Sequence, residues 1–261
     1  MKRTRIDRLP DSIPEEFHAL ARGARIYDSS CSPEARVYYI ERDEGMYLKQ
    51  GKVGTLQREA ELHAYFSSLG LTSELLAYRS GESDCMLTRR VRGEDCTYPD
   101  YLANPERLVD TLAYRLRKLH ETPYQACPVQ DRMKSYFALA NENYINGSYD
   151  KSHFPDSFGY RSEAEAYAVM RNAPEALTSR VLLHGDYCLP NVMLDRWEFS
   201  GFIDLGGAGV GDRHIDLFWG VWTLEFNLHT DKYASRFLDA YGRDVIDTEL
   251  LRVVGACEVF G

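Results

Sequence analysis

The chain has 261 residues, of which 44% are hydrophobic, and its 31 basic and 40 acidic side chains give a formal net charge of −9. This ordinary apolar content provides a core for one large domain or two modest lobes without disulfide or metal staples. The acidic balance and the lack of a long basic run argue against nucleic-acid binding, which depends on basic patches that neutralise phosphates.

Six scattered cysteines, none of them in a C-x-x-C pair, are typical of buried thiols in a reducing compartment. The charged residues at the N-terminus have no apolar segment behind them, so we expect no signal peptide. No window approaches the roughly 18 apolar residues of a membrane helix. We therefore expect a cytoplasmic protein that contacts no membrane and is a monomer or a weak dimer.

Short strands and one helix are predicted over about the first 95 residues. β-branched and aromatic residues predict a strand over 36–40, turn residues follow, and 46–49 return as its partner strand. Apolar residues at helical intervals predict a helix over 56–69, with Gly70 where a C-cap belongs. Residues 75–78 and 85–88 are typical of a hairpin.

The pattern changes after Val91, where helical spacing begins to dominate. A stripe of leucines predicts a helix that begins near Pro105, with Asn104 as its cap. We expect helices between 133 and 173 around a loop at 146–160, three short strands at 181–183, 192–194 and 199–203, and helices from Asp212 onward. The fold class is therefore predicted to be α+β, with a small β-rich N-terminal lobe and a larger, mostly helical C-terminal lobe.

The residues that carry chemistry begin with His184-Gly185-Asp186, which follows an apolar strand. Asn191 lies five residues after Asp186, and Asp204 opens an Asp-Leu-Gly at the end of a later strand. The order matches the kinase signature H-R-D-L-x-x-x-N followed by D-F-G. Alone, H-G-D is compatible with a turn capped by its Asp, and D-x-G is common where a strand ends. Both in order, each behind an apolar strand, predict a phosphotransferase.

Phosphoryl transfer explains why these residue types stand at this spacing. The reaction needs a hydroxyl aimed in line with the phosphate and metal ions that bridge the phosphate oxygens. Asp186 can accept the hydroxyl proton as the catalytic base. Asn191 and Asp204 supply the hard oxygen ligands that Mg²⁺ prefers.

Lys49 is the candidate phosphate-binding lysine, because it ends a strand well upstream of the catalytic loop. Taken alone, it is more typical of an exposed strand lysine. The helix that follows carries Glu59 and Glu61, and we choose Glu59 as the ion-pair partner of Lys49. No G-x-G-x-x-G is present, but small polar residues over 28–36 offer backbone N–H and hydroxyl donors to a phosphate.

The stretch from Val181 to Asp216 resembles the aminoglycoside phosphotransferases, in particular their 3′-phosphotransferase branch. The phrases HGD-x-CLPN, F-SGFIDLG and GV-x-DR-x-x-D carry the resemblance, and fainter similarity covers nearly the whole chain. It implies a bilobal, protein-kinase-like fold, with a nucleotide-binding lobe over residues 1–92 and a catalytic and substrate-binding lobe over residues 93–261. It also implies ATP or GTP with Mg²⁺ as cofactors, and phosphorylation of an aminoglycoside at its 3′-hydroxyl, which confers resistance. The nucleotide-contacting residues that it implies are Ser32, Tyr47, Lys49, Glu59 and Val91.

The sequence departs from the family pattern at positions that are expected to bind the acceptor substrate. Gly207 follows D-x-G where the family commonly has Arg, Cys257 stands where an acidic residue often precedes the closing E-x-F, and Gly261 follows that Phe. The loop at 146–160 is poor in acidic residues. The candidate contacts to a polycationic, aminoglycoside-like substrate are Asp156, Glu258 and the carboxylate of Gly261.

Two other hypotheses stay open. The first is a kinase of the same fold that acts on a different hydroxylated small molecule, which the departures motivate. The second is a non-catalytic nucleotide-binding module, against which the presence of the base, both metal ligands and the lysine argues. The sequence does not distinguish ATP from GTP.

Overall fold

The structure is a computed structural model of the chain and describes residues 3–31, 35–149 and 159–261. The chain divides into two compact units. The first contains Met1–Gly93 and Met193–Gly206, and the second contains Glu94–Val192 and Gly207–Gly261. The later segment Met193–Gly206 therefore belongs to the first unit, and it contains Asp204.

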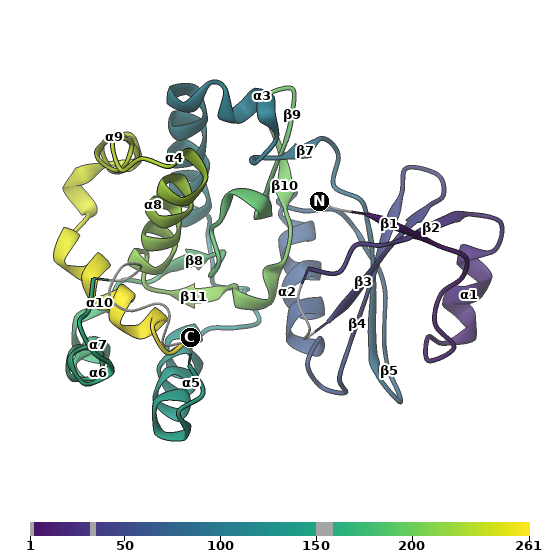
Figure 1. The fold of residues 1–261 in the computed structure, drawn as a ribbon, viewed down its shortest axis with the longest axis horizontal. Helices are drawn as coiled ribbons and strands as arrows, with labels where there is room; N and C mark the ends of the chain where they lie inside the picture. The colour runs from purple at the N-terminus through teal and green to yellow at the C-terminus, as the bar shows by residue number, and fades with distance from the viewer. Residues whose placement is uncertain (1–2, 32–34, 150–158) are drawn as a thin grey trace. The chain divides into compact units, whose positions relative to one another are not determined.

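An antiparallel six-stranded sheet with the order β1-β2-β3-β4-β6-β5 forms the body of the first unit (Figure 1). The predicted strand, its partner and the following hairpin are all present in it. The register of β3 and β4 places Val37 opposite Lys49 and Tyr39 opposite Tyr47. The strands are β1 (Thr4–Ile6), β2 (Arg25–Asp28), β3 (Arg36–Glu41), β4 (Met46–Gly51), β5 (Leu75–Ser80) and β6 (Asp84–Arg89).

Different helices cover the two faces of this sheet. Because successive side chains of a strand point to opposite faces, Leu48 packs with Phe17 of α1 (Glu15–Ala21) in one cluster. Met86 packs with Ala60 of α2 (Gln57–Ser68) in another. Lys49 follows Leu48, so its side chain lies on the α2 face of the sheet.

Helix α1 corrects the prediction of a single helix in this region. It has only seven residues, and two of them, Phe17 and Ala21, are buried. So short a segment contains too few turns for an apolar period to emerge from the sequence. Helix α2 agrees with the prediction, and Gly70 beyond its end has the positive φ of +70° expected of a residue that terminates a helix.

The strands β9 (Val192–Asp195) and β10 (Glu198–Phe202) bring the later segment into the first unit. Phe202 donates its backbone N–H to Leu71 at 2.8 Å and accepts from the Thr72 hydroxyl at 2.7 Å. At Gly93, with φ +85°, a Cβ would lie 2.0 Å from the carbonyl oxygen of Leu194, so only glycine permits this close approach. These contacts fix the strand that ends just before Asp204.

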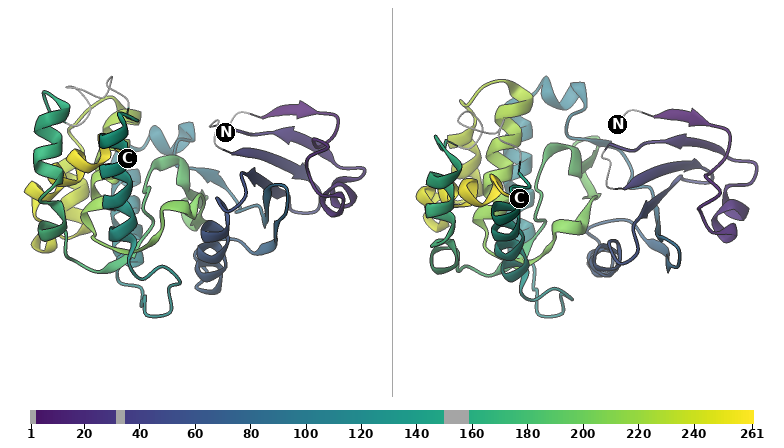
Figure 2. Two further views of the ribbon diagram at one scale, coloured as in Figure 1. Left: turned by 90° about the horizontal axis from the view of Figure 1, so that it is seen from below. Right: turned by 60° about the horizontal axis from the view of Figure 1, so that its bottom comes forward.

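Helices and a two-stranded sheet form the second unit (Figure 2). Strand β8 (Val181–Leu183) pairs antiparallel with β11 (Gly209–Gly211), which is not among the predicted strands because Gly-Val-Gly carries no β-forming run. The remaining elements are β7 (Glu94–Asp95), α3 (Pro99–Leu102), α4 (Pro105–His120), α5 (Arg132–Asn146), α6 (Glu163–Met170), α7 (Ala173–Ala176), α8 (His214–Leu228), α9 (Ala234–Tyr241), α10 (Thr248–Glu258) and the 3₁₀ turns η2 (Leu189–Asn191), η3 (Leu205–Gly207) and η4 (Arg243–Val245).

Helix α4 begins at Pro105 as predicted, but Asn104 does not cap it with its side chain. The Asn104 amide donates instead to the carbonyl of Asp100, in the short helix that precedes α4. An asparagine side chain at a helix start can accept from the first N–H groups of the helix or donate to a carbonyl of the preceding turn. Here it bonds the preceding turn.

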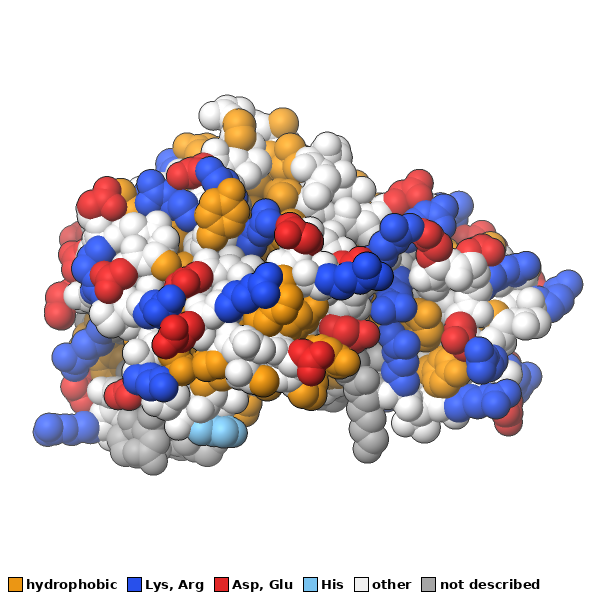
Figure 3. Space-filling model, turned by 90° about the horizontal axis from the view of Figure 1, so that it is seen from above, with side chains coloured by type: hydrophobic (Ala, Val, Ile, Leu, Met, Phe, Trp, Pro, Cys, Tyr) orange, Lys and Arg blue, Asp and Glu red, His pale blue; other side chains and the backbone are white. Residues whose placement is uncertain are grey.

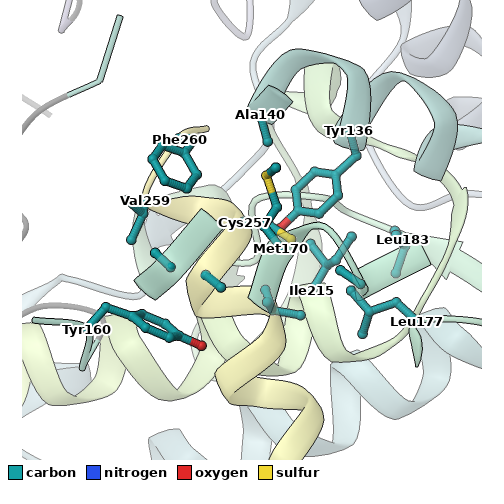
Figure 4. Packing of buried hydrophobic residues seen from close by; sticks show 14 of the residues in the cluster. Tyr136, Ala140, Tyr160, Met170, Leu177, Leu183, Ile215, Cys257, Val259 and Phe260 are labelled. Carbon is teal, nitrogen blue, oxygen red and sulfur yellow. The ribbon is translucent and has the colours of Figure 1, made fainter. Parts of the chain in front are cut away.

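The core of the second unit gathers residues from α5, α6, β8, α8 and the C-terminal end (Figure 4). Cys257 is 0% exposed within it. Helix α8 approaches α9 so closely that a Cβ on Gly220 would lie 2.5 Å from the ring of Phe237. One side of α8 is therefore committed to the interior of this unit.

All six cysteines are free thiols. In the part of the chain that the structure describes, no helix combines the length and apolar character needed to cross a membrane. Basic and acidic side chains lie interspersed over the face drawn in Figure 3.

Candidate active site

Lys49, the predicted phosphate-binding lysine, makes two ion pairs inside the first unit. Its Nζ lies 2.8 Å from Oε2 and 2.9 Å from Oε1 of Glu59, and 3.0 Å from Oδ1 of Asp204. Glu61, on the same helix, is exposed and does not make this contact. Although burial alone would lower it, the two carboxylates raise the pKa of Lys49, so the amine is charged at neutral pH.

Asp204 holds an unusual backbone conformation directly after β10. Its φ is +58°, in the left-handed region that aspartate tolerates better than most residues. The side chain is 55% exposed although it pairs with Lys49. A strained, exposed carboxylate beside a lysine that can hold phosphate has the chemistry of a ligand for a hard cation such as Mg²⁺.

Asp186, the predicted base, lies in the second unit on the loop after β8. The loop turns at Gly185, with φ +82°, where a Cβ would lie 1.9 Å from the carbonyl oxygen of Gly207. The amide Nδ2 of Asn191 donates to the Asp186 carbonyl at 3.0 Å and to its carboxylate Oδ2 at 2.8 Å. Because both of these bonds use the nitrogen of Asn191, its amide oxygen points the other way and suits a metal ion.

The buried carboxylate of Asp216 holds the backbone of this loop. Asp216, 0% exposed, accepts the backbone N–H of His184 at 2.8 Å and that of Gly185 at 2.7 Å. His120 Nε2 lies 3.1 Å from Asp216 Oδ2, and His120 Nδ1 lies 2.7 Å from the hydroxyl of Tyr241. Burial lowers the pKa of His120, so the ring is neutral at pH 7, donates from Nε2 and accepts from Tyr241.

Sequence reasoning gave no role to Asp216 or His120. Asp216 does close the GV-x-DR-x-x-D phrase, so a signal was present, but its partners lie 31 to 96 residues away in the chain. Only the fold shows which backbone groups this carboxylate holds.

Arg132 of α5 is a further residue that the sequence did not single out. Its Nε donates to the carbonyl of Gly207 at 2.8 Å, and its guanidinium lies 5.4 Å from the ring centroid of Tyr136. Gly207 is the position where the family commonly has Arg, and here a cation from another helix contacts it. The two residues are 75 positions apart, which is why no local pattern indicates the pairing.

Glu258, one of the predicted acceptor contacts, lies at the end of α10. The Tyr136 hydroxyl donates to Glu258 Oε1 at 2.7 Å, and the Trp219 side chain also hydrogen-bonds this carboxylate. Burial raises the pKa of Glu258 to about 7, and the negative charge of Asp186 adds to this against the lowering effects of Tyr136, Arg132 and Trp219.

The end of the chain lies beside Glu258. A Cβ on Gly261 would lie 3.0 Å from Glu258 Oε2, and the Gly261 N–H donates to the Glu258 carbonyl. The neighbouring Cys257 points into the core, and Figure 4 shows the Tyr136 hydroxyl directed toward it. An acidic residue in place of Cys257 would be buried at high cost, so this departure changes the interior of the second unit.

Four predicted residues complete the set. Ser32 and Asp156 lie outside the described residues. The Tyr47 hydroxyl accepts from Arg3 at 2.6 Å, and Val91 is buried against Gly201; their contact with a nucleotide stays a prediction. Over the described ranges, no group of three or more His, Cys, Asp and Glu is arranged to hold a metal. The ligands predicted for Mg²⁺ are not such a group, because they are one amide, Asn191, and one carboxylate, Asp204.

Comparison with known proteins places this site in a family. Residues 33–253 match the model of the phosphotransferase enzyme family. A probable aminoglycoside 3′-phosphotransferase of Lactococcus lactis is 49% identical over 253 residues, which is 96% of each chain. The crystal structure of a type VIII aminoglycoside-3′-phosphotransferase matches with a TM-score of 0.80 at 22% identity, over 95% of this chain and 97% of that one. An aminoglycoside phosphotransferase of Streptomyces rimosus, solved with ADP and streptomycin, matches with a TM-score of 0.72 at 24% identity, over 86% and 90% of the two chains.

The chain therefore belongs to the phosphotransferase enzyme family. The resemblance read from the sequence is confirmed, as is the prediction of an enzyme that phosphorylates a small molecule. The predicted α+β fold, with a β-rich N-terminal region and a mostly helical C-terminal part, is confirmed by the solved structures that share it.

Proposed function

We propose that this enzyme transfers the γ-phosphate of ATP or GTP to the 3′-hydroxyl of an aminoglycoside and thereby confers resistance. The observation that carries the proposal is the Asp186 carboxylate held by Asn191 at 2.8 Å, in a chain 49% identical to a probable aminoglycoside 3′-phosphotransferase. The free cysteines suit the reducing cytoplasm, where we place it as a monomer or a weak dimer.

Asp186 acts as the base in this proposal. Its carboxylate accepts the proton of the acceptor hydroxyl as the hydroxyl oxygen attacks the γ-phosphorus, and the bond from that phosphorus to the bridging β-phosphate oxygen breaks. Asn191 fixes the direction of the carboxylate through its amide nitrogen. Both residues stand on a loop whose backbone Asp216 holds, so the base is oriented before the acceptor arrives.

Residues 1–92 are proposed to hold the nucleotide and residues 93–261 the acceptor. The Lys49 amine, kept charged by Glu59, binds phosphate oxygens, while Tyr47 and Val91 contact the base of the nucleotide. The amide oxygen of Asn191 and the carboxylate of Asp204 fit Mg²⁺, which when bound neutralises the charge of the phosphates. The Streptomyces rimosus relative solved with ADP supports a nucleotide here.

A resistance profile tests the proposal. Expression in a sensitive host should raise the inhibitory concentration of kanamycin but not that of an analogue that lacks the 3′-hydroxyl. The same host carrying Asp186→Ala should remain sensitive to both compounds. Turnover of another hydroxylated acceptor, with none of any aminoglycoside, would replace this function with the alternative kinase. Tight nucleotide binding without transfer to any acceptor would instead favour the non-catalytic module.

Acceptor binding should depend on pH through Glu258. With a pKa of about 7, this carboxylate is mostly protonated at pH 6 and mostly ionised at pH 7.5, and only the ionised form attracts an ammonium group. The affinity for kanamycin should therefore rise about fivefold or more between these pH values and be lost again as the pH falls through 7. Calorimetric titration at a series of pH values measures the profile.

Two variants isolate this effect. Glu258→Gln should flatten the profile at the weak-binding level. Glu249→Gln, which removes an exposed carboxylate at the other end of α10, should keep the wild-type profile. An unchanged pH dependence in Glu258→Gln would remove this residue from the acceptor site.

A further inference from the structure

Arg132, the first residue of α5, is a half-buried cation that has no role in the function proposed above. Its Nε donates to the carbonyl of Gly207 at 2.8 Å. Its Nη1 lies 3.3 Å from the Ser135 hydroxyl, and its guanidinium lies 5.4 Å from the centroid of the Tyr136 ring. Burial lowers the pKa of Arg132, but a guanidinium stays charged at neutral pH. The bond to Gly207 is therefore a charge-assisted one, which is stronger than a bond between neutral groups.

The Arg132 side chain starts from a fixed point, because the beginning of α5 is docked on β11. Val210 of β11 donates its backbone N–H to the carbonyl of Val129 at 2.8 Å, three residues before Arg132. At Gly209, with φ +143°, a Cβ would lie 2.9 Å from the Val129 side chain and 3.1 Å from Arg132 Cβ. Only glycine leaves enough space here for the stem of the arginine.

The carbonyl that Arg132 holds also contacts the turn before Asp186. A Cβ on Gly185 would lie 1.9 Å from the Gly207 carbonyl oxygen, so this oxygen lies directly against the Gly185 backbone. A Cβ on Gly207 would in turn lie 3.0 Å from the Gly185 carbonyl oxygen. Because the two backbone segments are packed without a gap, a shift of one displaces the other.

Two partners therefore hold the turn at Gly185. Asp216 accepts the Gly185 N–H at 2.7 Å, and the Gly207 carbonyl packs against the same residue. Gly207 has no side chain to restrict its own backbone, so its carbonyl keeps this direction only while a donor fixes it. Since Asp186 follows Gly185 directly in the chain, a rotation at this turn would change the direction of the Asp186 carboxylate.

We propose that Arg132 is a positioning residue for phosphoryl transfer. Through the Gly207 carbonyl it holds the turn at Gly185, and it thereby sets the direction in which the Asp186 carboxylate meets the acceptor hydroxyl. This role rests on the proposed function, and it needs no contact of Arg132 with phosphate or acceptor. The feature that turnover requires is the Nε–H donor and not the charge alone. The guanidinium at Gly207 thus comes from α5, whereas the family commonly carries one on the residue at that position.

Two substitutions of Arg132 separate the donor from the bulk of the side chain. Arg132→Gln places an amide N–H at the position of Nε without the charge, and Arg132→Met places a methyl group there. Steady-state kinetics with kanamycin should give a kcat about 10- to 100-fold below wild type in Arg132→Met, and at least about fivefold higher than that in Arg132→Gln. The KM values for nucleotide and kanamycin should change little in both variants, because only the direction of the base is altered.

Hydrogen exchange of the Gly185 amide, measured without any acceptor, gives a second readout. It should be about tenfold faster in Arg132→Met than in wild type, and close to wild type in Arg132→Gln. The matched control is Arg180→Met. Arg180 Nη2 donates to the carbonyl of Gln130 at 3.0 Å, so this variant loses a bond from a guanidinium to a carbonyl that lies outside the catalytic loop. It should keep the wild-type kcat and exchange rate.

The remaining outcomes count against the proposal. A kcat close to wild type in Arg132→Met would overturn the positioning role while the proposed function stands. Equal losses of kcat in Arg132→Met and Arg132→Gln would assign the effect to the missing charge, and a loss without faster exchange would show that the loop is unchanged; either result overturns it. If wild type phosphorylates no aminoglycoside, the proposed function fails, and the exchange of the Gly185 amide still decides whether Arg132 holds the loop.

Discussion

Replacement of Asp186 by Asn is expected to lower kcat by about 10²- to 10⁴-fold, the usual contribution of a general base. Asparagine has nearly the same shape and still accepts a hydrogen bond from the Asn191 amide, which the carboxylate receives at 2.8 Å. It cannot accept the proton of the acceptor hydroxyl. The KM for the nucleotide should change little, because the proposed phosphate contacts are made by Lys49 and the metal ligands. Steady-state kinetics with kanamycin as acceptor measures both constants.

The matched control for this variant is Asp195→Asn at the end of β9, an exposed aspartate with no assigned role. It should keep the wild-type kcat, which shows that the loss at Asp186 is not a general effect of removing a surface charge. A melting temperature close to wild type in Asp186→Asn would show that the loop stays folded. A kcat within twofold of wild type in that variant would mean that another group takes the proton.

The parts of the site that the sequence predicts are those whose partners are local. Asp186 and Asn191 share one loop, so their spacing alone places the amide near the carboxylate. Lys49 and Glu59 belong to a strand and the helix that follows it, and the resemblance to the family selects Glu59 over Glu61. Each of these pairs needs only neighbouring secondary structure to come together, and the structure contains both contacts.

The remaining parts depend on tertiary packing, which no local pattern encodes. Arg132 and Gly207 are 75 residues apart in the sequence. Only the fold therefore shows that a guanidinium contacts Gly207, the position that departs from the family pattern. Cys257 marks a missing acid in the sequence, but its side chain points into the core. Side-chain direction at a helix end depends on how the helix docks, which explains why the sequence predicted a substrate-side effect for it.

The second large effect is expected from Asp216→Ala. This carboxylate accepts from three donors, the buried His184 N–H and His120 Nε2–H and the partly buried Gly185 N–H. Alanine would leave all three unsatisfied in the interior, so the free energy of unfolding should fall by about 3–5 kcal/mol. Denaturant titration measures this loss. The carboxylate also sets the path of the loop that aims Asp186, so kcat of the folded protein should fall about 10²-fold.

Asp212 supplies the control that separates these two effects. It is also buried, and its carboxylate accepts the backbone N–H of Ser179 at 2.7 Å and that of His214 at 2.9 Å, so it holds groups away from the catalytic loop. Asp212→Ala should therefore lose a comparable free energy of unfolding, yet keep kcat near wild type when assayed at low temperature, where the protein stays folded. Equal kcat losses in the two variants would show that lowered stability, not the position of the loop, limits turnover. Full stability in Asp216→Ala would show that water or other groups satisfy the His184 and Gly185 N–H groups, and that the loop is aimed by Asn191 alone.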